Sequence, residues 1–154
     1  MMKRTKRILF MALTGLLICF IWGQSMLPQK TSAAESSRLM NLIKPLLDPG
    51  DRIDEETFHH YIRKAAHFSE FAALGFCMNG FFRNLVWKRK PLHIPATVAG
   101  CAFVAAVDES IQLFTDGRGA RVSDFLLDVS GAVFGLAVLS LLLYALHIWR
   151  KPDG

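Results

Sequence analysis

Ionisable side chains gather at the start of one apolar stretch of this chain. Arg63, His67 and Glu70 are spaced i, i+4 and i+7, so on a helix they share one face, and Lys64 lies beside that face. Two cations, an imidazole and a carboxylate in one place can bind an anionic group or move a proton. The pattern predicts a polar site, and its chemistry stays open at this point.

Two later segments carry the same residue types at helical spacing. One is DESIQLF at 108–114, and the other is DFLLDVSGAVFG at 124–135, which follows the loop TDGRGAR. The second also holds Gly131 and Gly135, a GxxxG step that predicts close packing of this helix on a neighbour. The further candidate site residues are Asp108, Glu109, Gln112, Arg118, Arg121, Asp124 and Asp128.

Four apolar runs would position these residues. They lie at about 8–26, 61–82, 92–114 and 124–149, and a membrane-spanning helix needs about 20 predominantly apolar residues. The hydrophobic fraction is 52% and the mean hydropathy is +0.30, both high for a soluble domain. We therefore predict an all-α fold, an integral membrane bundle of four transmembrane helices that forms a single domain over residues 1–154.

The first run has a second reading as a cleaved signal peptide. It follows a basic start, and the small residues SAA stand at 32–34. The stretch between the run and these residues, GQSMLPQKT, is long and polar for a cleavage region. This composition favours a retained helix.

Basic residues set the expected orientation in the cell membrane. They cluster at 3–7, 83–90 and 150–151, in short segments next to the helix ends, as cytoplasmic charges do. We therefore expect both termini in the cytoplasm. At about 1.5 Å of rise per residue, Glu70, Asp108 and Asp128 then lie about 13, 9 and 6 Å from the outer ends of their helices. All three fall in the outer half of the bilayer.

A short amphipathic helix is predicted outside the cytoplasm, between the first two spans. Four apolar residues follow the i, i+3, i+4, i+7 pattern, namely Leu39, Leu42, Ile43 and Leu46. The sequence DPG at 48–50 ends this helix, and Asp54 marks the start of the next one. The amphipathic helix lies in the membrane interface or packs over the mouth of the bundle, and the sequence leaves both positions open.

The polar layer itself has two explanations. A carboxylate that faces lipid costs about 2.5–3.5 kcal/mol, so these groups should face the bundle interior and pair with one another. They could form a network that only stabilises the bundle. Helix association usually relies on small residues and single amides, however, and this layer holds many more polar groups. We predict an outward-facing pocket.

The composition argues against several other classes. The net charge of +5 could suggest nucleic acid, but the basic residues flank the apolar runs, so we expect no nucleic-acid partner. Three cysteines at wide spacing match neither a disulfide framework nor a metal site. We assign no metal ligand and no cofactor. The sequence leaves open whether a metal ion enters the carboxylate layer, and which oligomeric state the chain adopts.

The same residues resemble the VanZ-like family. The resemblance rests on RKAAHFSEFAALG at 63–75, DESIQLF at 108–114, GR at 117–118 and DFLLDVSGAVFG at 124–135, and WGQSMLP at 22–28 is similar to the family's Ser-rich exit from its first span. Many members have an amide where this chain has Asp128. The resemblance implies a small bacterial envelope membrane protein, since the family's namesake is associated with low-level resistance to the glycopeptide teicoplanin. It implies no established reaction.

Three functions compete on this sequence. The first is binding of a membrane lipid or lipid-linked cell-wall material in the pocket, where the anion contacts would be Arg63, Lys64, Arg118 and Arg121. The second is a membrane-embedded hydrolase or transferase, in which His67 acts as a general base beside Glu70 or Asp108. No serine stands at a recognised nucleophile spacing, and Ser69 could bond to its own helix backbone. The third is proton-linked transport, but the ionisable groups stop at mid-membrane.

Overall fold

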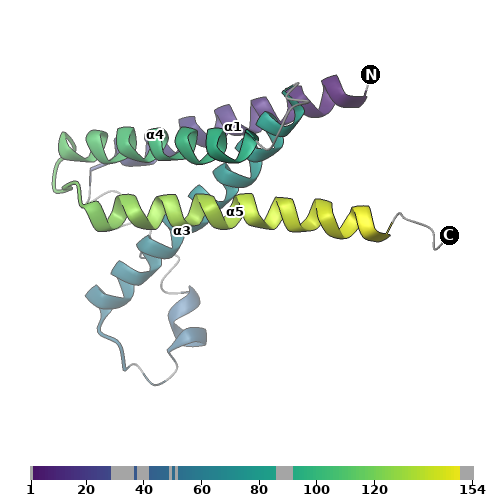
Figure 1. The fold of residues 1–154 in the computed structure, drawn as a ribbon. Coiled ribbons are helices and arrows are strands. Elements are labelled where there is room, and N and C mark those ends of the chain that lie inside the picture. Colours follow the sequence, from purple (N-terminus) through teal and green to yellow (C-terminus); the bar gives the residue numbers. More distant parts are fainter. Residues whose placement is uncertain are drawn as a thin grey trace.

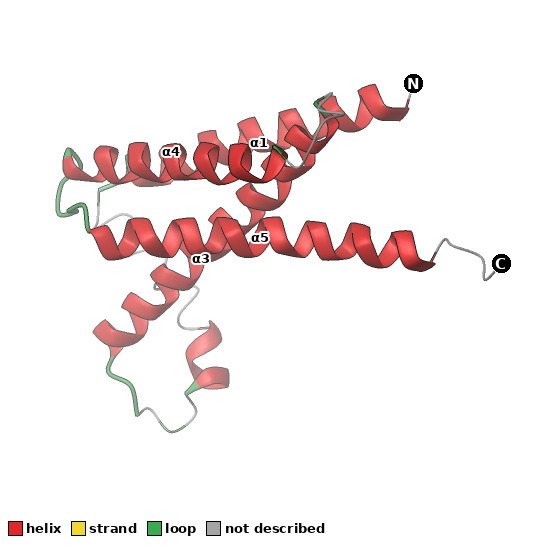
Figure 2. Cartoon of the chain, viewed as in Figure 1, coloured by secondary structure: helices red, strands yellow, loops and turns green. Residues whose placement is uncertain are grey.

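The protein is described by a computed structural model that covers residues 2–28, 37, 42–48, 50, 52–85 and 92–149. Within these ranges all regular structure is helical (Figure 2), which confirms the predicted all-α class. The long helices are α1 (Met2–Ser25), α3 (Glu55–Asn84), α4 (His93–Leu113) and α5 (Val122–Trp149). The predicted runs end within two residues of these helices, and α3 begins six residues before the apolar run at 61–82.

Figure 1 shows α1, α4 and α5 lying lengthwise, with α3 crossing them at a steep tilt. Helix α3 contacts all three of the others, and its contact with α5 is the most extensive in the chain. The N-terminus and the end of α5 lie at one end of the bundle, and the loop between α4 and α5 lies at the other (Figure 1). Successive long helices therefore run in alternating directions.

The contact between α3 and α5 depends on glycines. A Cβ atom on Gly131 would lie 2.5 Å from the carbonyl oxygen of Phe68, and one on Gly135 would overlap the carbonyl oxygen of Ala72. Gly75 meets the backbone of α5 in the same way. The prediction that Gly131 and Gly135 pack the last helix closely on a neighbour is confirmed, and that neighbour is α3.

Helix α3 starts where the sequence predicted. The carboxylate of Asp54 accepts a hydrogen bond from the backbone N–H of Thr57 at 3.0 Å, so it caps the helix that begins at Glu55. In the preceding turn, the carboxylate of Asp48 accepts hydrogen bonds from the N–H groups of Ile53 and Arg52, and these lower the pKa of Asp48 from its ordinary value. Asp48 therefore satisfies backbone donors just before α3, and Asp54 satisfies one in its first turn.

The predicted amphipathic helix lies only partly within the described residues. Residues 42–47 are helical, while Leu39 lies outside the described residues. The side chains of Leu42 and Leu46 are 72% and 81% exposed, so these two leucines do not cover the bundle. A position of this segment in the membrane interface stays a prediction.

Among the described residues, three helical segments are long and apolar enough to cross a membrane, namely Arg4–Ser25 in α1, His93–Leu113 and Val122–Trp149. Many of their large apolar side chains are exposed, among them Leu16, Phe103 and Leu141, as expected of surfaces that face lipid. Helix α3 carries too many charged residues to meet the same test. It nevertheless supplies much of the core, including the fully buried Phe71 and Leu74.

Candidate functional site

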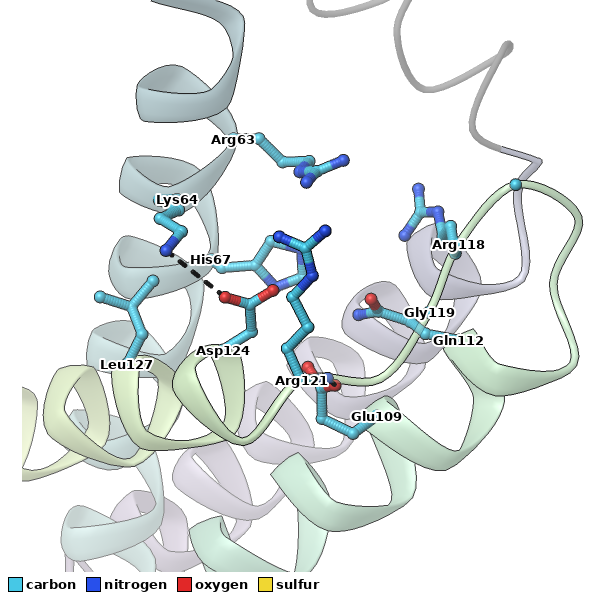
Figure 3. A pocket seen from close by; sticks show the side chains of 11 residues that line it. Arg63, Lys64, His67, Glu109, Gln112, Arg118, Gly119, Arg121, Asp124 and Leu127 are labelled. Carbon is cyan, nitrogen blue, oxygen red and sulfur yellow. Dashed lines mark hydrogen bonds and ion pairs between the residues drawn. The ribbon is translucent and has the colours of Figure 1, made fainter. Parts of the chain in front are cut away.

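An open polar pocket of about 130 Å³ lies where the first half of α3, the end of α4, the following loop and the start of α5 meet (Figure 3). Most of the residues predicted for the site line it. The lining residues are Arg63, Lys64, His67, Glu109, Gln112, Gly117, Arg118, Gly119, Arg121, Asp124 and Leu127. Glu70, Asp108 and Asp128, also predicted for the site, are not among them.

The pocket is lined by four basic side chains, namely Arg63, Lys64, Arg118 and Arg121, and two of them differ in whether they have a polar partner. The Nζ atom of Lys64 lies 3.5 Å from Oδ1 of Asp124, an ion pair that joins α3 to α5 (Figure 3). The Nε atom of Arg118 is buried and has no hydrogen-bond partner among the described residues. Burial and the nearby Arg63 lower the pKa of Arg118 from its ordinary value, although an arginine side chain stays charged in water. Arg118 therefore carries a positive charge with an unused donor.

The loop that carries Arg118 is held by specific bonds. Gly117 has a φ of 75°, in the left-handed region that favours glycine, and so allows the tight turn. The N–H of Arg118 donates to the carbonyl oxygen of Thr115 at 3.1 Å. At the far end of the loop, Oε2 of Glu109 accepts the N–H of Arg121 at 2.8 Å. Glu109 thus acts as a loop anchor as well as a pocket wall.

Three side chains from three helices meet beneath the pocket. His67, Asp108 and Asp128 each offer one atom such that all three atoms lie within 4.8 Å of one another. Nδ1 of His67 is 3.7 Å from Oδ1 of Asp128. Asp108 is fully buried and Asp128 is 1% exposed, whereas the imidazole reaches the pocket. We call these three residues the buried triad.

The two carboxylates of the buried triad have different surroundings. Asp108 accepts hydrogen bonds from the hydroxyl of Ser25 at 2.6 Å and from the amide of Gln112 at 2.9 Å. Neither oxygen of Asp128 has a hydrogen-bond partner in the part of the chain that the structure describes. One acid is therefore held in place by donors, and the other is buried without any.

The remaining predicted residue, Glu70, is half-buried and within electrostatic range of Asp108 and Arg118. It belongs neither to the pocket wall nor to the buried triad. The structure brings both Asp108 and Asp128 close to His67, whereas the expected acidic neighbour was Glu70 or Asp108. The helix crossing decides this pairing, because it determines which residue of α5 comes to face His67.

Sequence reasoning missed two polar contributions. Ser25 at the end of α1 is fully buried and donates a hydrogen bond to Asp108. In the sequence, its segment WGQSMLP indicates only a similarity to the family and no contact with Asp108. Deeper in the bundle, the amide of Asn79 donates to the carbonyl oxygen of Leu136 and to the hydroxyl of Ser140, each at 3.2 Å. A lone asparagine within an apolar run was the available signal for this contact.

The serines near the pocket are engaged elsewhere. The hydroxyl of Ser69 donates to the carbonyl oxygen of Ala66 at 2.8 Å, as predicted for a serine bonded to its own helix. The hydroxyl of Ser123 donates to Asp124 at 3.2 Å in an exposed position. Neither serine contacts His67, the candidate general base.

Comparison with known proteins supports the assignment made from the motifs. The family model described as VanZ/LLP1 matches residues 10–144, a range that includes the pocket, the buried triad and Ser25. The chain belongs to the VanZ/LLP1 family. No curated protein and no solved structure matches it.

Proposed function

We propose that this protein is a bacterial envelope membrane protein with four spans, whose pocket opens at the outer face and binds a phosphate-bearing group of a membrane lipid or of lipid-linked cell-wall material. By holding such material it would contribute to resistance to glycopeptides of the teicoplanin type. Both termini would lie in the cytoplasm.

The case for α3 as the fourth span rests on where its charges lie. Arg63, Lys64 and His67 line the pocket and so are turned toward the protein. Ionisable groups inside a membrane are tolerated where they face the bundle interior and pair there. Helix α3 also contacts each of the three apolar helices. Its sequence is too polar for a helix surrounded by lipid but suits one enclosed by others.

The observation that carries the binding proposal is Arg118. Its guanidinium is charged, has a buried donor without a partner among the described residues, and lines an open pocket. A guanidinium presents several donors in a plane that matches phosphate or carboxylate oxygens. Arg63 and Arg121 line the same pocket and would add to its positive potential. An anionic group that enters the pocket would satisfy the unused donor.

Lipid analysis of the protein purified in mild detergent tests this proposal. A phosphate-bearing lipid should co-purify with the wild type, and mass spectrometry will show whether it is a phospholipid or a polyprenyl-linked molecule. Arg118→Gln should reduce its occupancy about tenfold or more, because a charge-assisted hydrogen bond contributes about 1.5–3 kcal/mol.

Arg83→Gln is the matched control. Arg83 is exposed in the last turn of α3, at the other end of this helix from the pocket residues. The control protein should retain the lipid. Equal lipid occupancy in Arg118→Gln and the wild type, or no bound lipid in the wild type, would refute the proposal.

A catalytic role remains the alternative. His67 lies 3.7 Å from a carboxylate and is open to the pocket, which is the arrangement of a base oriented by an acid. A hydrolase of this kind would activate water rather than a protein nucleophile, since Ser69 and Ser123 bond elsewhere. Release of phosphate or of a head group from the co-purified lipid, lost in His67→Gln, would favour this function over binding alone.

A further inference from the structure

We propose that the buried triad of His67, Asp108 and Asp128 binds one divalent metal ion beneath the pocket. The residue types indicate an ion that accepts mixed imidazole and carboxylate ligands, such as Mn²⁺ or Zn²⁺, rather than one restricted to oxygen ligands. The site is distinct from the anion contacts at the pocket wall, and it does not depend on the proposed lipid binding.

The geometry is close to that of a metal site. One ligand atom from each of the three side chains lies within 4.8 Å of the other two, and Nδ1 of His67 lies 3.7 Å from Oδ1 of Asp128. Ligands bound about 2.1 Å from a single ion are roughly 3 to 4 Å apart. A bound ion would therefore need to draw the three side chains together only slightly.

Asp128 provides the independent indication of a ligand. It is 1% exposed, and both of its carboxylate oxygens are buried without a hydrogen-bond donor within the described ranges. A buried carboxylate whose oxygens accept no hydrogen bond is unfavourable unless it takes up a proton or lies beside a cation. The neighbouring Asp108 places a second acidic group within the same few ångströms. The imidazole Nδ1 of His67, 3.7 Å from Asp128, is too far away for a hydrogen bond, and a metal cation among the three side chains would satisfy both acids while leaving them ionised.

The surroundings of Asp108 resemble the outer contacts of metal ligands. Carboxylate ligands are commonly oriented by hydrogen bonds from residues that do not touch the metal. Ser25 donates to one oxygen of Asp108 at 2.6 Å, and Gln112 donates to the other at 2.9 Å. These bonds fix the carboxylate in place, and each oxygen can still accept a metal ion through its remaining lone pair.

The site would be reached through the pocket. The side chain of His67 is 22% exposed and lines the pocket, whereas Asp108 and Asp128 lie behind it. An ion held there could add water molecules or a ligand oxygen at its open positions. The metal would then form the floor beneath the guanidinium of Arg118.

Metal binding is measured on detergent-purified protein after chelation and reconstitution with Mn²⁺ or Zn²⁺. We expect about one ion per chain in the wild type. Asp128→Asn should lower the affinity at least tenfold, since it replaces an anionic ligand with a neutral one. The control Asp116→Asn removes the same charge from an exposed position in the loop between α4 and α5, and should bind like the wild type.

A spectroscopic measurement on the wild type covers the case in which Asp128→Asn fails to fold. Pulsed electron paramagnetic resonance of the Mn²⁺-loaded protein should show coupling to an imidazole nitrogen, and His67→Gln should abolish it. Three results would overturn the proposal: no stoichiometric binding of either ion to the wild type, unchanged affinity in a folded Asp128→Asn protein, or bound Mn²⁺ without nitrogen coupling. A single proton shared by the two carboxylates would then account for the buried triad.

Discussion

The same substitution, glycine to alanine, should have opposite effects at different glycines of this bundle. At Gly15 in α1, a Cβ atom would have no neighbour within 4 Å. At Gly131 it would lie 2.5 Å from the carbonyl oxygen of Phe68, and at Gly135 it would overlap that of Ala72. These obstacles are backbone atoms of α3, which cannot move without shifting the whole helix.

The expected magnitudes follow from these contacts. Ordinary contact begins at 3.4 Å, so Gly131→Ala requires α3 and α5 to separate by about 0.9 Å, and Gly135→Ala requires more. Overpacking typically costs about 1–3 kcal/mol, whereas alanine gains about 1 kcal/mol over glycine within a helix. We expect Gly131→Ala to lower the free energy of unfolding by about 1–2 kcal/mol and Gly135→Ala by about 3 kcal/mol or more. Gly15→Ala should be neutral or stabilising.

Thermal unfolding in detergent, followed by size-exclusion chromatography, measures this order. Each kcal/mol corresponds to about 2–4 °C in Tm for a chain of this size. Because α3 carries His67 and α5 carries Asp128, the two glycine variants of α5 should also weaken any property that depends on the buried triad. The reasoning fails if Gly135→Ala unfolds at the same temperature as the wild type and Gly15→Ala.

Two further predictions concern the site and the topology. Ser25→Ala should reduce the free energy of unfolding by about 1.5–3 kcal/mol, because Asp108 loses a buried donor. The control Ser110→Ala removes an exposed hydroxyl from the same helix as Asp108 and should change this free energy little. Chemical or thermal unfolding measures both variants, and equal effects would contradict the role of Ser25. In intact cells, with the native cysteines replaced, an impermeant thiol reagent should label a cysteine introduced at the exposed Asp116 but not one introduced at Lys88. The reverse result would invert the topology.

Much of the fold could be predicted from the sequence because the apolar runs are long and the residues that begin and end the helices are recognisable. The capping carboxylate of Asp54 marks the start of α3 in both the sequence and the structure. The predicted span at 61–82 covers only part of α3, because hydropathy is low over residues 55–60 while the helix includes these charged residues. Charged residues can extend a helix past the membrane surface. Hydropathy therefore indicates the membrane-spanning part of a helix but not the residue at which the helix begins or ends.

The site was predictable as a group of residues but not as a set of pairs. Helical periodicity places Arg63, His67 and Glu70 on one face, and this face does turn toward α4 and α5. Which carboxylate meets His67 depends on the tilt of α3 across α5, and a sequence gives no value for that tilt. The contribution of Ser25 was equally hidden, since a single serine after an apolar run has no periodic pattern. Its partner, Asp108, lies 83 positions later in the chain.

That separation has a consequence for how the protein is made. Ser25 leaves the ribosome long before α4, so its hydroxyl is already at the end of α1 when the acidic end of α4 reaches the membrane. Asp108 can then accept the hydrogen bond from Ser25, whereas Asp128 follows later in the chain, on α5. The bond between Ser25 and Asp108 can therefore form before α5 has packed against α3, whereas the buried triad is complete only after that packing.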